Sequence, residues 1–132
     1  EDYVRLDDEM FVPSANQGTI IVVARKGSQA EYYSRMLDDA ATRTETMIER
    51  RILETVGGGC VVPMAVHATV SGGQARVLAE VLSLDGKRFV RLDEKISLQE
   101  DPLRRAEDIG QRLMNMGGRE LVDEAVKEFG AR

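Results

Sequence analysis

The side chain of this sequence best suited to covalent chemistry is its single cysteine. Cys60 follows three consecutive glycines at positions 57–59 and is the only cysteine among 132 residues. Glycine reaches backbone conformations that other residues avoid, so a thiol on this stretch is expected to be mobile and accessible. An accessible thiolate can act as a nucleophile or as a covalent attachment point. The alternative is that Cys60 is a small buried hydrophobic residue and that the glycines only end a helix.

The other residues that could do chemistry point to ordinary structural roles. His67 is the only histidine, and it has no acidic or cysteine neighbours at ligand spacing. We therefore expect it to be structural or on the surface and predict no metal site, because metal sites need several ligands. The glycine run is not a phosphate-binding loop, because it follows a helix and lacks Gly-Lys-Ser/Thr. Glu49 and Arg50 are interpreted as part of a salt-bridged helix surface.

Composition limits the classes of function. The net charge is −5 and 31% of the residues are charged, which favours a globular domain and argues against a nucleic-acid-binding surface. No apolar stretch approaches the roughly 20 residues of a membrane span, so no membrane association is expected. One cysteine cannot form a disulfide within the chain, which favours the reducing cytoplasm as its location.

The elements next to Cys60 are predicted to be a helix before it and a strand after it. The capping-box pattern Thr42-x-x-Glu45 predicts a helix start, and apolar residues at helical spacing continue this helix to Val56. Alternating apolar residues then predict three strands, over 62–70, 74–84 and 87–96. Short turns between them favour an antiparallel meander with one solvated face.

Turn and cap signals predict the remaining organisation. Asp85-Gly86, between the second and third strands, is the strongest short hairpin signal in the chain. Asp101-Pro102 predicts a helix that runs to Gly117-Gly118, and a last helix is predicted over 121–129. Ser28-x-x-Glu31 predicts a further helix that runs to about Asp39. The expected fold class is α+β, with a three-stranded antiparallel sheet covered on one face by helices.

The first part of the chain is expected to be separate from this sheet. Residues 1–17 form an extended lead-in, and the apolar run Thr19–Ala24 predicts a strand that is covered on both faces. The antiparallel meander offers no such place, so we assign residues 1–27 to a missing upstream domain. Residues 28–132 form the C-terminal α+β domain. The uncovered strand also makes self-association possible through edge pairing.

Two motifs together resemble a known family. Pro13-Ser14-Ala15-Asn16-Gln17-Gly18 precedes the apolar run, and Gly58-Gly59-Cys60-Val61-Val62-Pro63 follows about thirty-five residues after that run. Their order and spacing resemble the C-terminal part of porphobilinogen deaminase (hydroxymethylbilane synthase), from about Phe11 to the end of the chain. The departures are Asn16 for the usual Gly, Val23-Ala24 for Glu-Cys, and Gly57 for Glu.

The resemblance implies a role in tetrapyrrole biosynthesis. The family condenses four porphobilinogen molecules into hydroxymethylbilane on a dipyrromethane cofactor, which Cys60 would hold covalently. Gln17 matches a position near that cofactor, and Arg25 matches one close to the cleft. The glycines would let the anchor shift as the pyrrole chain grows.

The resemblance also implies what this stretch does not supply. The catalytic aspartate and the arginines that bind substrate carboxylates come from the upstream domains, so no catalytic residue is expected here. The implied partners are porphobilinogen, the pyrrole-chain intermediates and those domains. The fragment alone is expected to be inactive, and it could lack the cofactor.

Two other functions are compatible with the residues alone. The chain could be a non-catalytic α+β binding or regulatory domain in which Cys60 is structural. Cys60 could also be a redox-sensing thiol, although no second cysteine is present to resolve an oxidised form.

Overall fold

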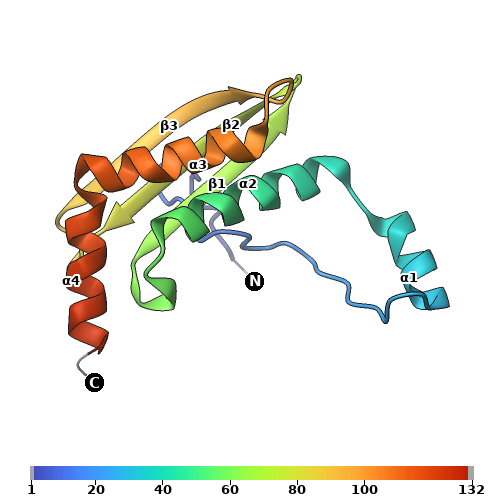
Figure 1. Cartoon of the computed structure of the whole chain (residues 1–132), viewed down its shortest axis with the longest axis horizontal. Helices are drawn as coiled ribbons and strands as arrows, with labels where there is room; N and C mark the ends of the chain where they lie inside the picture. The colour runs from blue at the N-terminus through green and yellow to red at the C-terminus, as the bar shows by residue number, and fades with distance from the viewer. Residues whose placement is uncertain (1, 131–132) are drawn as a thin grey trace.

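A three-stranded antiparallel sheet lies at the centre of the computed structural model, which describes residues 2–130. Its strands follow the chain in the order β1 (Met64–Ser71), β2 (Gln74–Leu82) and β3 (Phe89–Ser97). The α+β class and the meander are therefore confirmed. Figure 1 shows the long helices in front of the sheet, on one of its faces.

The two hairpins differ in how well the sequence predicts them. Gly72 and Gly73 join β1 to β2 with φ of 57° and 77°, as a two-residue turn requires. The second hairpin is longer than Asp85-Gly86 predicts, because the strands end at Leu82 and resume at Phe89. Ser83 N–H donates to the Arg88 carbonyl oxygen at 2.8 Å, and Arg88 N–H donates to Ser83 Oγ at 3.0 Å. These bonds close a wider loop around the Asp-Gly pair.

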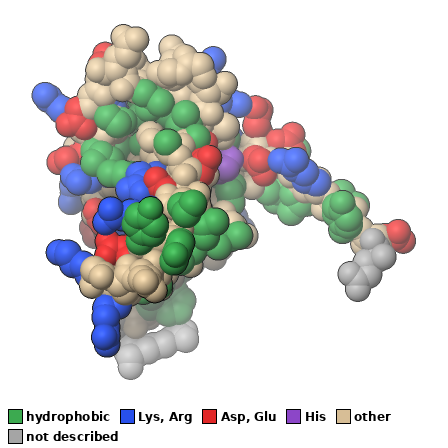
Figure 2. Space-filling view, turned by 90° about the vertical axis from the view of Figure 1, so that its right-hand side faces the viewer, with side chains coloured by type: hydrophobic (Ala, Val, Ile, Leu, Met, Phe, Trp, Pro, Cys, Tyr) green, Lys and Arg blue, Asp and Glu red, His purple; other side chains and the backbone are tan. Residues whose placement is uncertain are grey.

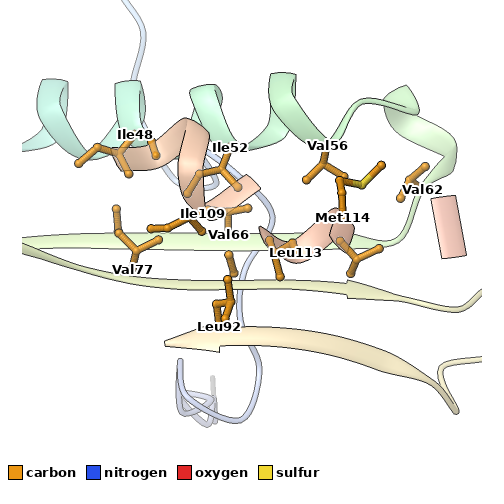
Figure 3. Close-up of a cluster of buried hydrophobic side chains, with 14 of the residues drawn as sticks. Ile48, Ile52, Val56, Val62, Val66, Val77, Leu92, Ile109, Leu113 and Met114 are labelled. Atoms are coloured by element: carbon orange, nitrogen blue, oxygen red, sulfur yellow. The ribbon is translucent and has the colours of Figure 1, made fainter. Parts of the chain in front are cut away.

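The hydrophobic core lies between the sheet and two helices, α2 (Ala40–Val56) and α3 (Pro102–Leu113). Figure 3 shows side chains of both helices meeting those of the strands. The largest side chains that are fully buried in this layer are Ile48, Ile52, Val66, Val77, Val81, Ile96, Ile109 and Leu113. Burial of such apolar side chains is the main stabilising contribution to a domain of this kind.

The helix that precedes Cys60 begins earlier than its capping box predicts. Asp39, not Thr42, is the N-cap, and its carboxylate accepts a hydrogen bond from Thr42 N–H at 2.8 Å. This leaves the carboxylate of Glu45 free to bond elsewhere. The start of α1 (Gln29–Ser34) at the Ser28 cap is confirmed, but this helix is short and buries no residue.

A π-helical turn connects the last two helices. Met114–Gly118 follows α3 directly, and Gly117 within it has φ of 115°. The chain then continues as α4 (Arg119–Gly130), which runs across the end of the sheet in Figure 1. The predicted break at Gly117-Gly118 is therefore confirmed, since the left-handed φ of Gly117 suits glycine.

The lead-in does not form the predicted strand in this structure. Residues 19–25 have no regular secondary structure, because no segment within residues 2–130 pairs with them. Ile20 and Val23 are each 90% exposed. Figure 2 faces the side on which α1 lies in Figure 1, and it shows hydrophobic side chains gathered there. The assignment of residues 1–27 to another domain stays a prediction.

Candidate functional site

The thiol of Cys60 is exposed at the surface. Cys60 lies in the 3-10 turn η2 (Gly59–Val61), between the end of α2 and the start of β1. The expectation that the thiol is accessible is therefore confirmed. The alternative in which Cys60 is a buried hydrophobic residue is wrong for this conformation.

The three glycines before Cys60 have different surroundings. Gly57, Gly58 and Gly59 have φ of 74°, 78° and 67°, so all three occupy the region that favours glycine. An added Cβ at Gly57 or Gly59 would meet nothing within 4 Å, whereas one at Gly58 would lie 2.3 Å from Val62 Cγ2 and 3.1 Å from Val122 Cγ1. Gly58 is thus packed against Val62, which lies just before β1, and against Val122 of α4. Gly57 and Gly59 have open space instead.

Gln17 lies on an exposed turn of the lead-in. Gln17 N–H donates to the Ser14 carbonyl oxygen at 3.1 Å, and Gln17 Oε1 accepts from Ser14 Oγ at 3.0 Å. Asn16 in the same turn has φ of 61°. Asn is among the few residues other than Gly that adopt this conformation readily. Asn16 therefore adopts a backbone conformation that glycine would also adopt readily.

Glu49 is not on the salt-bridged surface that the charge pattern indicates. Its side chain is buried, and it accepts hydrogen bonds from the backbone N–H groups of Asn16 and Ala68. Arg50, by contrast, pairs with Glu54 at 2.9 Å on the exposed face. The charge pattern therefore assigns Glu49 to the wrong surface, although one signal of its burial was present. Glu49 falls within the apolar stripe of α2, next to Ile48 and Ile52, where a carboxylate must find buried partners.

The predicted site residues do not converge in this structure. Within residues 2–130, no hydrogen bond or ion pair joins Cys60, Gln17 and Arg25. Arg25 is exposed and contributes its carbonyl oxygen to Ser28 N–H at 3.1 Å. The Gln17 turn lies beside β1, where the Pro13 carbonyl oxygen accepts from Val66 N–H at 2.9 Å. The hydrogen bonds and ion pairs of residues 2–130 therefore do not join these three residues into one site.

The outer face of the sheet carries a charged cluster. Arg76 pairs with Asp93 at 2.8 Å and with Glu9 of the lead-in at 2.6 Å. The hydrogen bond from Arg76 lowers the pKa of Asp93, and both partners raise the pKa of Arg76. A cavity of about 430 Å³ adjoins this cluster and is also lined by His67. Neither Cys60 nor Gln17 lines this cavity, so it is separate from the predicted site residues.

Other chemistry is not visible in the part of the chain that the structure describes. Between residues 2 and 130, no three His, Cys, Asp or Glu side chains come together as a metal site would need. None of the helices in this range has the length and apolar content to cross a membrane. His67 lies with Nδ1 at 3.6 Å from Glu49 Oε1, so it neighbours a structural carboxylate.

Comparison with known proteins adds to this geometry. Residues 43–116 match the family model described as porphobilinogen deaminase, C-terminal domain. That range includes most of α2, the Cys60 turn, the sheet, α3 and the start of the π-helical turn.

Individual relatives extend the similarity to nearly the whole chain. A probable porphobilinogen deaminase of Methanosarcina mazei is 43% identical over 123 residues, which is 92% of this chain and 39% of the relative. One of Methanococcoides burtonii is 43% identical over 130 residues, 97% of this chain and 42% of the relative. One of Methanocella arvoryzae is 44% identical over 125 residues. The chain spans about two-fifths of the length of these relatives. On these grounds, the chain belongs to the porphobilinogen deaminase family and corresponds to its C-terminal part.

Proposed function

We propose that Cys60 is the covalent attachment point of a dipyrromethane primer in a protein that condenses porphobilinogen into hydroxymethylbilane. The observation that carries the proposal is the exposed thiol on a glycine-flanked turn. It occupies the position at which the resemblance places the cofactor-bearing cysteine.

The surroundings of Cys60 fit a bulky covalent group. The thiol is at the surface, and within the preceding glycine run an added Cβ at Gly57 or Gly59 would meet open space. Attachment requires a thiolate that adds to the electrophilic carbon formed when porphobilinogen loses ammonia, which leaves a thioether to Cys60 Sγ. When bound, the primer supplies the pyrrole end to which further units are joined. Tethering it raises the effective concentration of that end.

Gln17 is the second residue that we assign to the cofactor. Its Oε1 is held by Ser14, and in the described part of the chain no residue accepts from its amide nitrogen. That nitrogen is a suitable donor for a carboxylate on the pyrrole rings. Arg25 is exposed and could pair with another such carboxylate.

The remaining machinery would come from protein outside this stretch. Porphobilinogen and its oligomers carry acetate and propionate groups, and binding several of these needs a set of arginines. The exposed side chains of residues 20–23 are apolar, and we propose that this segment joins a sheet of the upstream domain. We expect this stretch alone to bind no complete primer and to have no activity.

Activity of a Cys60 variant tests the proposal. The protein that carries these residues should form hydroxymethylbilane from porphobilinogen, and Cys60→Ser should abolish this formation while the thermal unfolding midpoint stays unchanged. Cys60 is exposed, so its substitution should cost little stability. Full activity in Cys60→Ser would instead favour a domain in which the cysteine has no chemical role.

A further inference from the structure

The buried carboxylate of Glu49 joins two parts of the chain that the sequence places far apart. The side chain is 5% exposed and lies in α2 among the residues of the core. A buried carboxylate is costly unless hydrogen bonds replace its hydration. The hydrogen-bond partners of Glu49 therefore indicate which structural role offsets the free-energy cost of burying its carboxylate.

Both oxygens of Glu49 accept hydrogen bonds from backbone N–H groups. Oε1 accepts from Ala68 of β1 at 2.8 Å, 19 residues away. Oε2 accepts from Asn16 of the lead-in at 2.6 Å, 33 residues away. The side-chain amide of Asn16, with its nitrogen turned toward the acceptors, adds bonds of 3.2 Å to Glu49 Oε2 and to the Thr46 carbonyl oxygen. The carboxylate thus fixes the Gln17 turn to helix α2 and to the sheet.

Glu45, one helical turn earlier, provides a natural comparison. Its Oε1 accepts from Val70 N–H at 2.7 Å, on the same edge of β1. Both glutamates therefore satisfy N–H groups at the free edge of the sheet, which otherwise would be open to pairing. Only Glu49 also bonds the lead-in. A comparison of Glu45 with Glu49 therefore distinguishes two effects: protection of the sheet edge, to which both contribute, and attachment of the Gln17 turn, to which Glu49 contributes.

We propose that Glu49 is a positioning residue that holds the Gln17 turn in a fixed place relative to the Cys60 domain. It acts through Asn16 and touches no pyrrole ligand itself. The effect of Glu49 on the reaction rests on the proposed function, because the position of the turn affects catalysis only if Gln17 contacts the ligand attached to Cys60. The attachment itself can be tested without that function.

Backbone hydrogen exchange tests the attachment in the protein that carries these residues. Glu49→Gln keeps the shape of the side chain but replaces one acceptor oxygen by a donor that would face an N–H group. We expect the Asn16 amide to exchange at least about tenfold faster in this variant. The control Glu45→Gln should accelerate exchange at Val70 and leave Asn16 unchanged. Equal protection of Asn16 in the wild type and in Glu49→Gln would overturn the inference.

Kinetics test the consequence for the reaction. With primer attached equally, as intact mass shows, Glu49→Gln should lower kcat/KM for porphobilinogen by about tenfold to a hundredfold. Glu45→Gln should have nearly wild-type kcat/KM, which separates positioning from loss of edge protection. Unchanged kcat/KM in a Glu49→Gln protein whose Asn16 exchanges freely would overturn the positioning role. A wild-type protein that carries no primer would refute the proposed function. The attachment of the Gln17 turn by Glu49 would then be tested by the hydrogen-exchange result alone.

Asn16→Gly is a second variant that leaves the buried carboxylate in place. Glycine keeps the positive φ of 61° at this position and removes only the side-chain bonds to Glu49 and Thr46. We expect a smaller decrease of kcat/KM in the same direction as for Glu49→Gln. The backbone N–H at position 16 keeps its bond to Glu49 Oε2 in this variant, so it should stay protected from exchange. If Glu49→Gln fails to fold, an amide at position 16 of Asn16→Gly that exchanges as fast as an unbonded amide would overturn the proposal.

Discussion

The packing of Gly58 makes the position of the Cys60 turn dependent on α4. The added Cβ of Gly58→Ala would lie 2.3 Å from Val62 Cγ2 and 3.1 Å from Val122 Cγ1. Contacts below 3 Å between carbon atoms are strongly repulsive. The Cys60 turn, the segment at Val62 or helix α4 would therefore have to move. Gly59→Ala is a matched control, because its φ of 67° is similar and its Cβ would meet nothing within 4 Å.

The two substitutions share one cost and differ in another. Alanine in the left-handed region costs about 1–2 kcal/mol at either position. Only Gly58→Ala adds overpacking, which typically costs about 1–3 kcal/mol. We therefore expect Gly58→Ala to be less stable than Gly59→Ala by about 1–3 kcal/mol. At a urea m value of about 2 kcal/mol/M, this difference separates the midpoints by about 0.5–1.5 M.

A double variant identifies the contact responsible. Val62→Ala removes the methyl group that the new Cβ would strike, although this change also loses buried apolar contact. The cost of Gly58→Ala should therefore be smaller in the Val62→Ala background, by about 1 kcal/mol or more. Equal midpoints for Gly58→Ala and Gly59→Ala, with no coupling to Val62, would refute the reasoning.

Three further substitutions test the fold. Gly110→Ala should lose about 1–2 kcal/mol despite the better helix propensity of alanine, because its Cβ would lie 2.7 Å from Thr55 Cβ where α2 meets α3; a stabilised variant in urea unfolding would contradict this packing. Leu113→Ala should cost about 2–5 kcal/mol, since Leu113 is fully buried; a loss below 1 kcal/mol would argue against its place in the core. The hydrogen bond from Thr42 N–H lowers the pKa of Asp39 below its ordinary 3.8. The ionised carboxylate of Asp39 therefore stabilises the folded protein fully above pH 3.8, the ordinary pKa, and this stabilisation is lost as the pH falls through the lower pKa of the folded state. Asp39→Asn should accordingly weaken the acid dependence of the unfolding free energy below about pH 4, and an unchanged acid profile would contradict the cap.

The sequence predicts the sheet and the exposure of Cys60 well because their signals are local. Alternation along each strand predicts the strand boundaries to within two residues, and the Asp101-Pro102 signal coincides with the start of α3. The accessibility of Cys60 follows from the glycines around it. Each of these signals lies within a few residues of the feature that it predicts.

The sequence fails where a side chain is bonded to backbone that is distant in the chain. The capping box at Thr42 is misleading because Glu45 bonds Val70 in place of its own helix start. Glu49 is misassigned for the same reason, since its partners Asn16 and Ala68 are 33 and 19 residues away. Neither pairing can be recognised before the fold brings α2 to the edge of β1.

The measurement that tests the central claim most directly is the intact mass of the protein that carries these residues, before and after Cys60→Ala. The account predicts that the native protein carries the additional mass of two linked pyrrole units and that the variant lacks it. A native mass equal to that of the unmodified polypeptide, and unchanged after incubation with porphobilinogen, would contradict the assignment of Cys60 as the cofactor anchor.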